Sequence, residues 1–270
     1  DWFTTSTPLR MRLVPGYPDY HPEFPGGRPQ GGRSVEPELF DFGELGGWAD
    51  TIFGMPRRMY VSESPIGGGS GFLTPEKERE RAAANLEGLG RALLAGLLKG
   101  LLDRGVQPFL GSAATELLVD DGAVRGARFA DGSEVRARRG VVLATGGFER
   151  DPELVTAFLR GPMSHPAGVP SNTGDGLKMA MRVGAQLGVM REAWWVPVVA
   201  EPGDESQQYA LHGVQLIQRE RSLPRTIMVN SRGQRFTNEA ANYNALGGAF
   251  HAFDPTEFRR VEPDLEARDA

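Results

Sequence analysis

The fold prediction rests on one stretch, Val141-Val-Leu-Ala-Thr-Gly-Gly-Phe148. Its first four residues are apolar and begin with two valines, which favours a short strand buried on both faces. Gly146 and Gly147 then leave no Cβ at the carboxyl end of that strand, so a ligand can approach the backbone closely. Ligands bind at this end of the strands in open α/β sheets. Taken alone, the pattern favours a tight turn after a core strand, so the functional interpretation depends on the surrounding sequence.

The residues before this stretch predict an antiparallel meander. Asp121-Gly122 and Asp131-Gly132 separate three segments of alternating polarity. Asp-Gly pairs are typical of tight hairpin turns. We expect three antiparallel strands over residues 115–138 that lead directly into the buried strand at residues 141–144. Together with a preceding helix, these elements predict an α/β fold with a mainly parallel sheet and an antiparallel insert.

Two helix starts stand on either side of this region. Thr74-Pro75-Glu76 combines an N-cap hydroxyl with proline at the first helical position and predicts one long helix to about Asp103. Asn172-Thr-Gly-Asp-Gly176 predicts a second helix to about Leu187, whose N-terminus presents free N–H groups to a ligand. Asp175 can accept hydrogen bonds from ligand hydroxyls. The alternative is an ordinary N-cap without any ligand.

The first 74 residues are rich in proline and glycine and are predicted to be irregular. Tyr17, Tyr20 and Phe24 are expected to anchor this segment to a core, with a tyrosine that reaches a binding site as the alternative. Gly67-Gly-Gly-Ser-Gly71 lacks the lysine of a phosphate-binding loop and is predicted to be a flexible loop. Because the chain begins with Asp1, we expect it to be part of a longer protein.

The character of the sequence changes near residue 188. Residues 192–199 are strongly apolar and aromatic, residues 223–230 have the composition of a strand, and Asn230-Ser-Arg-Gly233 is typical of a turn. We therefore predict two domains, residues 1–188 and residues 189–270.

The composition excludes several functional classes. With 270 residues, 40% hydrophobic and 24% charged, the chain is predicted to be globular. A formal net charge of −5 disfavours nucleic acid as the main partner. The absence of cysteine excludes disulfides and thiolate catalysis and fits a cytoplasmic location. The four histidines show no metal-ligand spacing, and no apolar stretch is long enough to span a membrane, so we predict no metal site and no span.

Three stretches in this order resemble one protein family. They are Ala144-Thr-Gly-Gly-Phe148, Asn172-Thr-Gly-Asp-Gly176 and Val229-Asn-Ser-Arg-Gly-Gln-Arg-Phe-Thr-Asn-Glu239. They resemble the FAD-binding oxidoreductases that include the fumarate reductase and succinate dehydrogenase flavoproteins and the 3-ketosteroid dehydrogenases. Pro18-Asp-Tyr-His-Pro22 is similar to the ketosteroid dehydrogenase branch. The resemblance covers about residues 85–250.

The resemblance implies FAD as cofactor. It also implies part of a glutathione-reductase-like FAD-binding domain with a β-meander, followed by part of an α+β substrate or capping domain. The family's G-x-G-x-x-G unit, which holds the FAD pyrophosphate, is not found in this sequence, and neither is its C-terminal segment. We therefore expect this chain alone to bind FAD poorly or not at all.

The resemblance also implies roles for individual residues. The backbone of Ala114 would face the adenine. The other residues expected to contact FAD are Thr145, Gly146, Gly147, Thr173, Gly174, Asp175 and Gly176. Arg235, Phe236, Asn238 and Glu239 would hold the substrate domain onto the flavin, with Glu239 buried and paired. The ion pair of Arg235 and Glu239 is as well explained by a purely structural role.

The residues after the second helix indicate the class of substrate. In the dicarboxylate branch of the family, a polar stretch follows the Gly-Asp-Gly helix, whereas this chain has Trp194 and Trp195. Apolar and aromatic walls suit a large hydrophobic ketone better than fumarate. The alternative is that at least one of the two tryptophans packs in the core of the second domain.

Tyr243 follows the third motif, as a catalytic tyrosine does in the ketosteroid dehydrogenases. The resemblance implies that it takes the proton from the carbon beside the ketone. A tyrosine with an ordinary pKa of about 10 needs a partner to act near neutrality, and Tyr20 is the candidate. The alternative is an ordinary half-buried tyrosine.

These observations predict a 3-ketosteroid 1-dehydrogenase-like enzyme with a small, hydrophobic, steroid-like ketone as substrate. The sequence does not indicate the electron acceptor. Two alternatives stay open. One is a flavin-dependent, fumarate reductase-like reductase of an activated C=C bond, and the other is a non-catalytic fragment.

Overall fold

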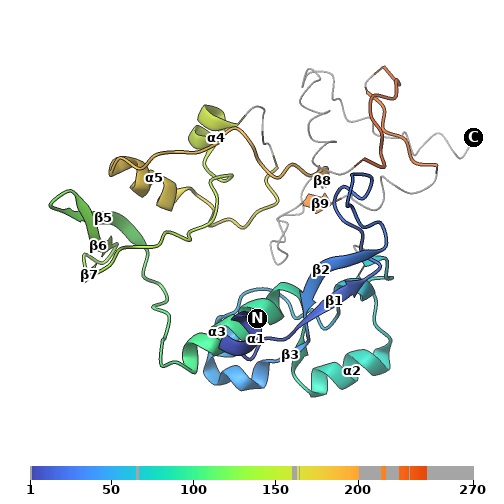
Figure 1. Cartoon of the computed structure of the whole chain (residues 1–270), viewed down its shortest axis with the longest axis horizontal. Coiled ribbons are helices and arrows are strands. Elements are labelled where there is room, and N and C mark those ends of the chain that lie inside the picture. Colours follow the sequence, from blue (N-terminus) through green and yellow to red (C-terminus); the bar gives the residue numbers. More distant parts are fainter. Residues whose placement is uncertain are drawn as a thin grey trace, which may run out of the picture. The chain divides into compact units, whose positions relative to one another are not determined.

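The computed structural model describes residues 2–64, 67–159, 163, 165–200, 214–216, 225–230 and 232–241. The chain divides into two compact units, Asp1–Pro108 and Phe109–Ala270 (Figure 1). The two units meet at residues 108–109, whereas the sequence predicts a boundary between functional domains near residue 188. That boundary stays a prediction.

The first unit is built from short strands and helices. β1 (Met11–Pro15) and β2 (Gly31–Pro37) form an antiparallel hairpin, and β3 (Phe40–Asp41) pairs with β4 (Leu86–Glu87). The helical elements are α1 (Trp2–Ser6), η1 (Phe42–Thr51), η2 (Val61–Glu63), α2 (Pro75–Ala83) and α3 (Leu89–Leu102).

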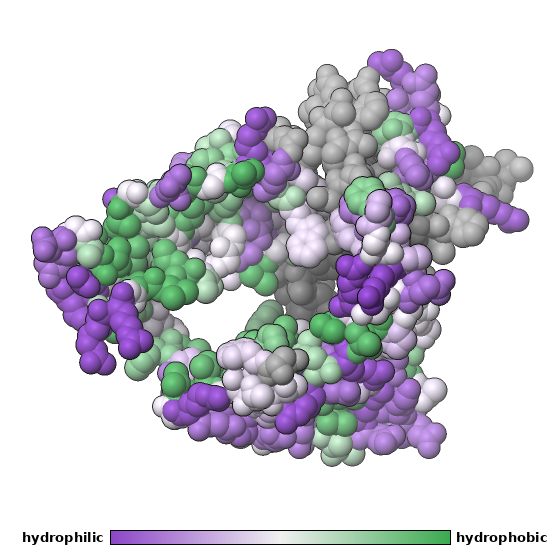
Figure 2. All heavy atoms as spheres, in the orientation of Figure 1, coloured by the Kyte–Doolittle hydropathy of each residue, from purple (hydrophilic) through white to green (hydrophobic). Residues whose placement is uncertain are grey.

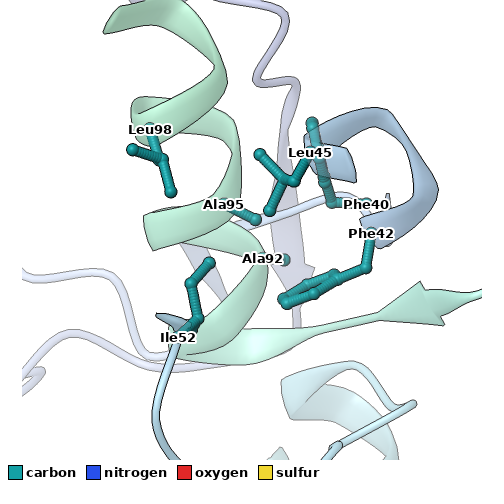
Figure 3. Close-up of a cluster of buried hydrophobic side chains, with 7 residues drawn as sticks. All are labelled: Phe40, Phe42, Leu45, Ile52, Ala92, Ala95 and Leu98. Carbon is teal, nitrogen blue, oxygen red and sulfur yellow. The ribbon is translucent and has the colours of Figure 1, made fainter. Parts of the chain in front are cut away.

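The core of this unit lies between η1 and α3 (Figure 3). α3 contributes small residues, which let other segments pack closely against it. At Gly96, for example, an added Cβ would lie 2.8 Å from Leu9 Cδ1. The buried residues of the cluster are Phe40, Phe42, Leu45, Ile52, Ala92, Ala95 and Leu98. The prediction that residues 1–74 are irregular is wrong for much of this segment, because β1, β2, β3 and η1 lie within it.

The aromatic residues expected to anchor the N-terminal segment do not reach this core. Tyr20 is 45% exposed, and Phe24 is also exposed. Both rings instead pack against His21 in their own loop, with a ring-centroid distance of 4.5 Å between His21 and Phe24. Tyr17 is half-buried. The anchoring prediction is thus wrong for Tyr20 and Phe24, because both rings pack against His21 and not against the core.

The single long helix predicted from Thr74 to Asp103 is also wrong. The N-cap itself is confirmed, because Thr74 Oγ1 accepts a hydrogen bond from Lys77 N. The helix then breaks at Asn85, which has a positive φ of 50° and whose carbonyl accepts a hydrogen bond from Phe42 N at 3.0 Å. Pairing with β3 thus replaces helical hydrogen bonds, and tertiary contacts override the helical spacing of the leucines.

An ion-pair network on η2 makes the stability of this unit depend on pH. Burial alone would raise the pKa of Glu63, but hydrogen bonds from Arg81, Lys77 and the N–H of Tyr60 outweigh it and lower the pKa to about 2. The unfolded value is about 4.3. Because the pKa of Glu63 is lower in the folded than in the unfolded chain, the network stabilises the fold fully at pH values above about 4.3. This stabilisation is lost as the pH falls toward 2.

We therefore expect wild type to lose about 1–2 kcal/mol more stability than Glu63→Gln between about pH 6 and about pH 3. Urea unfolding at the two pH values measures this difference. Glu80→Gln, an exposed change on the same helix as Arg81, serves as control and should behave as wild type. Equal losses in wild type and Glu63→Gln would contradict the prediction.

The second unit begins with the predicted meander. β5 (Ala114–Asp120), β6 (Ala123–Phe129) and β7 (Glu134–Arg136) form a three-stranded antiparallel sheet in the order β5-β6-β7. Asp121 and Gly122 both have positive φ, 47° and 70°, as a tight hairpin turn requires. The meander prediction is confirmed.

Two helices follow, α4 (Pro152–Phe158) and α5 (Asp175–Arg182). α5 packs on β5 and buries Met179. It begins where the sequence predicts but ends at Arg182 rather than near Leu187, because the chain turns at Gly184, whose φ is 80°. β8 (Val198–Ala200) and β9 (Val214–Leu216) form a further antiparallel pair.

The strand predicted at residues 141–144 is not formed. These residues belong to no strand, and Val142 is 90% exposed. A strand needs a neighbouring backbone for its N–H and C=O groups, and none of the strands in the described ranges pairs with this segment. All the described sheets are antiparallel, so the predicted parallel sheet is absent from this part of the chain.

The strand predicted at residues 223–230 is not formed within the described residues, which hold a single isolated bridge instead. Residues 225–230 hold one isolated bridge, from Val229 to Arg235, and residues 223–224 lie outside the described residues. The turn between the bridged residues is confirmed by the hydrogen bond from Gly233 N to Asn230 O at 2.9 Å.

Candidate cofactor-binding site

The two glycine-rich segments lie side by side in the second unit. Gly174 N donates a hydrogen bond to Gly147 O at 3.1 Å, and Arg150 N donates to Asn172 O at 3.0 Å. Gly174 has a φ of 73° and is the N-cap residue of α5. The convergence expected for residues 145–147 and 172–176 is thus present, while their contact with FAD stays a prediction.

The glycines in these segments are needed for contact between the segments themselves. A Cβ on Gly176 would lie 2.1 Å from Thr145 Oγ1, and one on Gly146 would lie 2.2 Å from Asn172 Oδ1. The sequence pattern predicts that these glycines let a ligand approach closely, and that contact stays a prediction. At Gly146 and Gly176 the structure adds a packing role, because the space of each missing Cβ is filled by a side chain of the other segment.

The groups that stay accessible at this junction are suited to a polyhydroxylated ligand. Thr145, Gly146 and Asp175 are exposed, and Thr173 is half-buried. The N-cap residue of α5 is Gly174, which has no side chain to accept hydrogen bonds from the first N–H groups of the helix. The Asp175 carboxylate would repel a phosphate placed there but would accept hydrogen bonds from hydroxyls. These residues fit the ribityl end of FAD better than its pyrophosphate.

Ala114 and the tryptophans occupy separate places in the same unit. Ala114 is half-buried at the start of β5, opposite Phe129 of β6. Trp194 is 77% exposed, so the core-packing alternative is wrong for this residue, whereas Trp195 is half-buried. An exposed indole is available to line a hydrophobic binding surface.

The predicted ion pair of Arg235 and Glu239 is present. Glu239 is 4% exposed, and its carboxylate accepts hydrogen bonds from Arg235 Nε at 3.1 Å and from Met228 N at 2.7 Å. The hydrogen bond from Arg235, helped by the N–H of Met228, lowers the pKa of Glu239 to about 2. Because the pair closes the turn at residues 230–234, its geometry supports the structural interpretation.

The roles proposed for the two tyrosines in proton transfer stay predictions. Tyr243 lies outside the described residues. Tyr20 belongs to the first compact unit, on the loop between β1 and β2.

A cavity of about 460 Å³ lies elsewhere, between the meander and α5. Figure 2 shows hydrophobic side chains gathered in this region. Its charged residues pair with one another, as Arg128 does with Glu116 and Glu134. The lining residues are Glu116, Leu117, Leu118, Val119, Arg128, Glu134, Arg136, Met179, Arg182 and Val183. None of the predicted site residues is among them.

No group of three or more metal-binding side chains is found within the described residues. Among the helices in that part of the chain, none has the length and apolar character to cross a membrane.

Comparison with models of protein families identifies the family of this chain. The family model for the FAD-binding domain matches residues 12–268. The chain belongs to this FAD-binding family. The predicted family and its cofactor, FAD, are thereby confirmed, and so is an overall fold of mixed helices and sheets.

Several individual proteins are similar to this member of the FAD-binding family. The 3-oxosteroid 1-dehydrogenase of Mycobacterium tuberculosis is 38% identical over 267 residues, covering 88% of this chain and 45% of the relative. The 4-oxocyclohexanecarboxylate 2-dehydrogenase of Sinomonas cyclohexanicum is 36% identical, covering 88% of this chain and 42% of the relative.

One solved structure is also similar. It is the 3-ketosteroid Δ1-dehydrogenase of Sterolibacterium denitrificans in complex with 1,4-androstadiene-3,17-dione. The match has a TM-score of 0.73 at 31% identity and covers 93% of this chain and 49% of that protein. The chain thus spans about half the length of the relatives that it matches.

Proposed function

We propose that this chain is part of a flavin-dependent dehydrogenase that oxidises a C–C bond next to the ketone of a 3-ketosteroid or a similar cyclic ketone. The observation that carries the proposal is the junction of residues 145–147 with residues 172–176, which leaves Thr145, Gly146 and Asp175 exposed. The similar dehydrogenases of ring ketones named above support the class of substrate.

The residues of the junction hold the cofactor in this proposal. Bound FAD supplies a hydride acceptor. Thr145 and the backbone of Gly146 would lie against it, Asp175 would accept hydrogen bonds from its ribityl hydroxyls, and the N-terminus of α5 would donate to it. The backbone of Ala114 contacts the adenine.

We assign residues 1–188 to an incomplete, glutathione-reductase-like FAD-binding domain and residues 189–270 to part of an α+β substrate domain. The length of the relatives, about twice that of this chain, supports this assignment.

The other residues act on the substrate. Tyr243 would take the proton from the carbon beside the ketone, and bound FAD would supply the hydride acceptor that conversion of the C–C bond to a C=C bond requires. Tyr20 assists Tyr243 as a hydrogen-bonding partner. Trp194, exposed as it is, forms part of a hydrophobic wall for the rings of the substrate.

A smaller substrate is the second candidate. The relative from Sinomonas cyclohexanicum is named for a single-ring ketone that carries a carboxylate, and its identity to this chain is nearly that of the steroid dehydrogenase. Both candidates undergo the same type of reaction and differ in the size and charge of the substrate.

Anaerobic mixing of the FAD-loaded protein with candidate ketones tests the proposal. A 3-ketosteroid is expected to bleach the visible absorbance of the oxidised flavin, because the hydride reduces it. Bleaching by 4-oxocyclohexanecarboxylate alone would favour the second candidate. Reoxidation of the reduced flavin by fumarate, with no bleaching by either ketone, would contradict the proposal and favour a reductase. Failure of the full-length protein to retain FAD would favour the non-catalytic alternative.

A further inference from the structure

Three consecutive charged residues follow the Gly-Gly-Phe turn, and each reaches a different part of the second unit. The Glu149 carboxylate accepts a hydrogen bond from Asn172 Nδ2 at 2.6 Å. Arg150 donates to the carbonyls of Pro166 and Gly168 at 2.9 and 2.8 Å. Asp151 caps α4 by accepting from Leu154 N at 2.8 Å, and it also pairs with Lys178 of α5. The triplet therefore ties the first glycine segment to the second and to both helices.

Arg150 and Asp151 have roles that the fold alone explains. Arg150 binds backbone carbonyls, and Asp151 is a helix cap whose pKa is lowered by the hydrogen bond from Lys178 and by the N–H of Leu154. Such contacts stabilise many loops and helix ends. Glu149 differs because its partner is a side chain of the second glycine segment.

The carboxylate of Glu149 sits in a slot that glycines leave open. A Cβ on Gly168 would lie 1.9 Å from Glu149 Oε1, and one on Gly147 would lie 2.3 Å from Oε2. The third side of the slot is the Asn172 amide, which donates to Oε1. Any side chain at residue 168 would therefore displace Glu149 from Asn172.

The bond to Glu149 also fixes what Asn172 does on its other side. With Nδ2 directed to Glu149, Asn172 Oδ1 occupies the space where a Cβ of Gly146 would be, 2.2 Å from that position. The amide is thus a spacer between the exposed turn at Gly146 and the segment that begins α5. If Asn172 rotated, the distance between the two segments would no longer be set.

We propose that Glu149 is a positioning residue that holds the two cofactor-facing segments at a fixed separation through Asn172. The inference rests on the proposed function, because it is the FAD surface that needs this separation. Glu149 itself is not required to contact FAD. Sequence reasoning missed it because a lone glutamate after Phe148 carries no motif, and its partner is 23 residues away.

Hydrogen exchange in the FAD-free chain tests the geometry without any activity measurement. The readout is the amide of Gly174, which donates to Gly147 O across the junction. In Glu149→Ala this amide should exchange about 10-fold faster, since one hydrogen bond to a charged group is lost. Glu149→Gln should restore slow exchange, because its amide oxygen still accepts from Asn172. Glu153→Ala, an exposed loss of the same charge on α4, should leave exchange at wild-type rates.

A second readout connects the geometry to the cofactor. Titration with FAD, followed by flavin fluorescence, should give a Kd about 10-fold higher for Glu149→Ala and near wild type for Glu149→Gln and Glu153→Ala. Asn172→Ala should weaken binding equally, and the double variant should be no weaker than either single one, because the two residues act as one unit.

The results of these experiments distinguish a failure of the positioning role of Glu149 from a failure of the proposed function. Unchanged exchange at Gly174 in Glu149→Ala, or no rescue by Glu149→Gln, would overturn the positioning role even if FAD binds. The proposed function fails if the full-length protein takes up no FAD, and the exchange experiment would still decide the role of Glu149.

Discussion

Replacing Tyr243 with phenylalanine is expected to slow flavin bleaching by a 3-ketosteroid at least about 100-fold, without changing the amount of bound FAD. The substitution removes only the hydroxyl that, in the proposed function, takes the proton from the carbon beside the ketone. General bases contribute about 10²–10⁴-fold to such steps. Stopped-flow absorbance of the FAD-loaded protein measures the rate, and the ratio of flavin to protein measures cofactor content.

Two matched tyrosine variants sharpen this experiment. Tyr17→Phe, a half-buried tyrosine next to the β1–β2 hairpin, should bleach at the wild-type rate. Tyr20→Phe should shift the pH profile of bleaching to higher pH if Tyr20 helps Tyr243 to ionise. Bleaching by Tyr243→Phe at the wild-type rate would remove Tyr243 from the mechanism, and an unshifted profile for Tyr20→Phe would remove Tyr20.

Gly174→Ala is expected to destabilise the second unit by about 3 kcal/mol and to abolish FAD binding. Gly174 has a φ of 73°, where an L-residue is strained by about 1–2 kcal/mol. Its new Cβ would lie 2.4 Å from Leu154 Cδ1 and 3.0 Å from Phe148 Cβ, so a buried side chain has to move. The hydrogen bond from Gly174 N to Gly147 O would be disturbed with it.

Denaturant unfolding and FAD titration of the same preparation check this prediction. Gly188→Ala is the control, because Gly188 does not need a positive φ and no atom lies within 4 Å of a Cβ there. That variant should lie within about 0.5 kcal/mol of wild type. If Gly174→Ala unfolds at the same denaturant concentration as Gly188→Ala, the close packing at the junction is not important for stability.

Local signals were sufficient for part of the fold. The meander was predictable because Asp121-Gly122 and Asp131-Gly132 specify their turns within a few residues. The start of α2 was predictable because Thr74 binds Lys77 N three residues away. By contrast, the leucine spacing from Leu86 onward favours a continuous helix over the weak stop signal of Asn85, and the break also depends on Phe42, 43 residues earlier in the chain. The predicted strand at residues 141–144 fails for a related reason, since a strand is defined by its neighbours.

The sequence by itself determined the family, the cofactor class and the two segments that would meet, because these depend on short motifs in a fixed order. Only the tertiary structure decided how the segments meet: the glycines of one leave space for the side chains of the other, and Glu149 holds Asn172 between them. The physical reason is how far apart in the chain the interacting groups lie. A turn or a cap is satisfied by backbone groups a few residues away, whereas a missing Cβ has meaning only once the atom that fills its space is known.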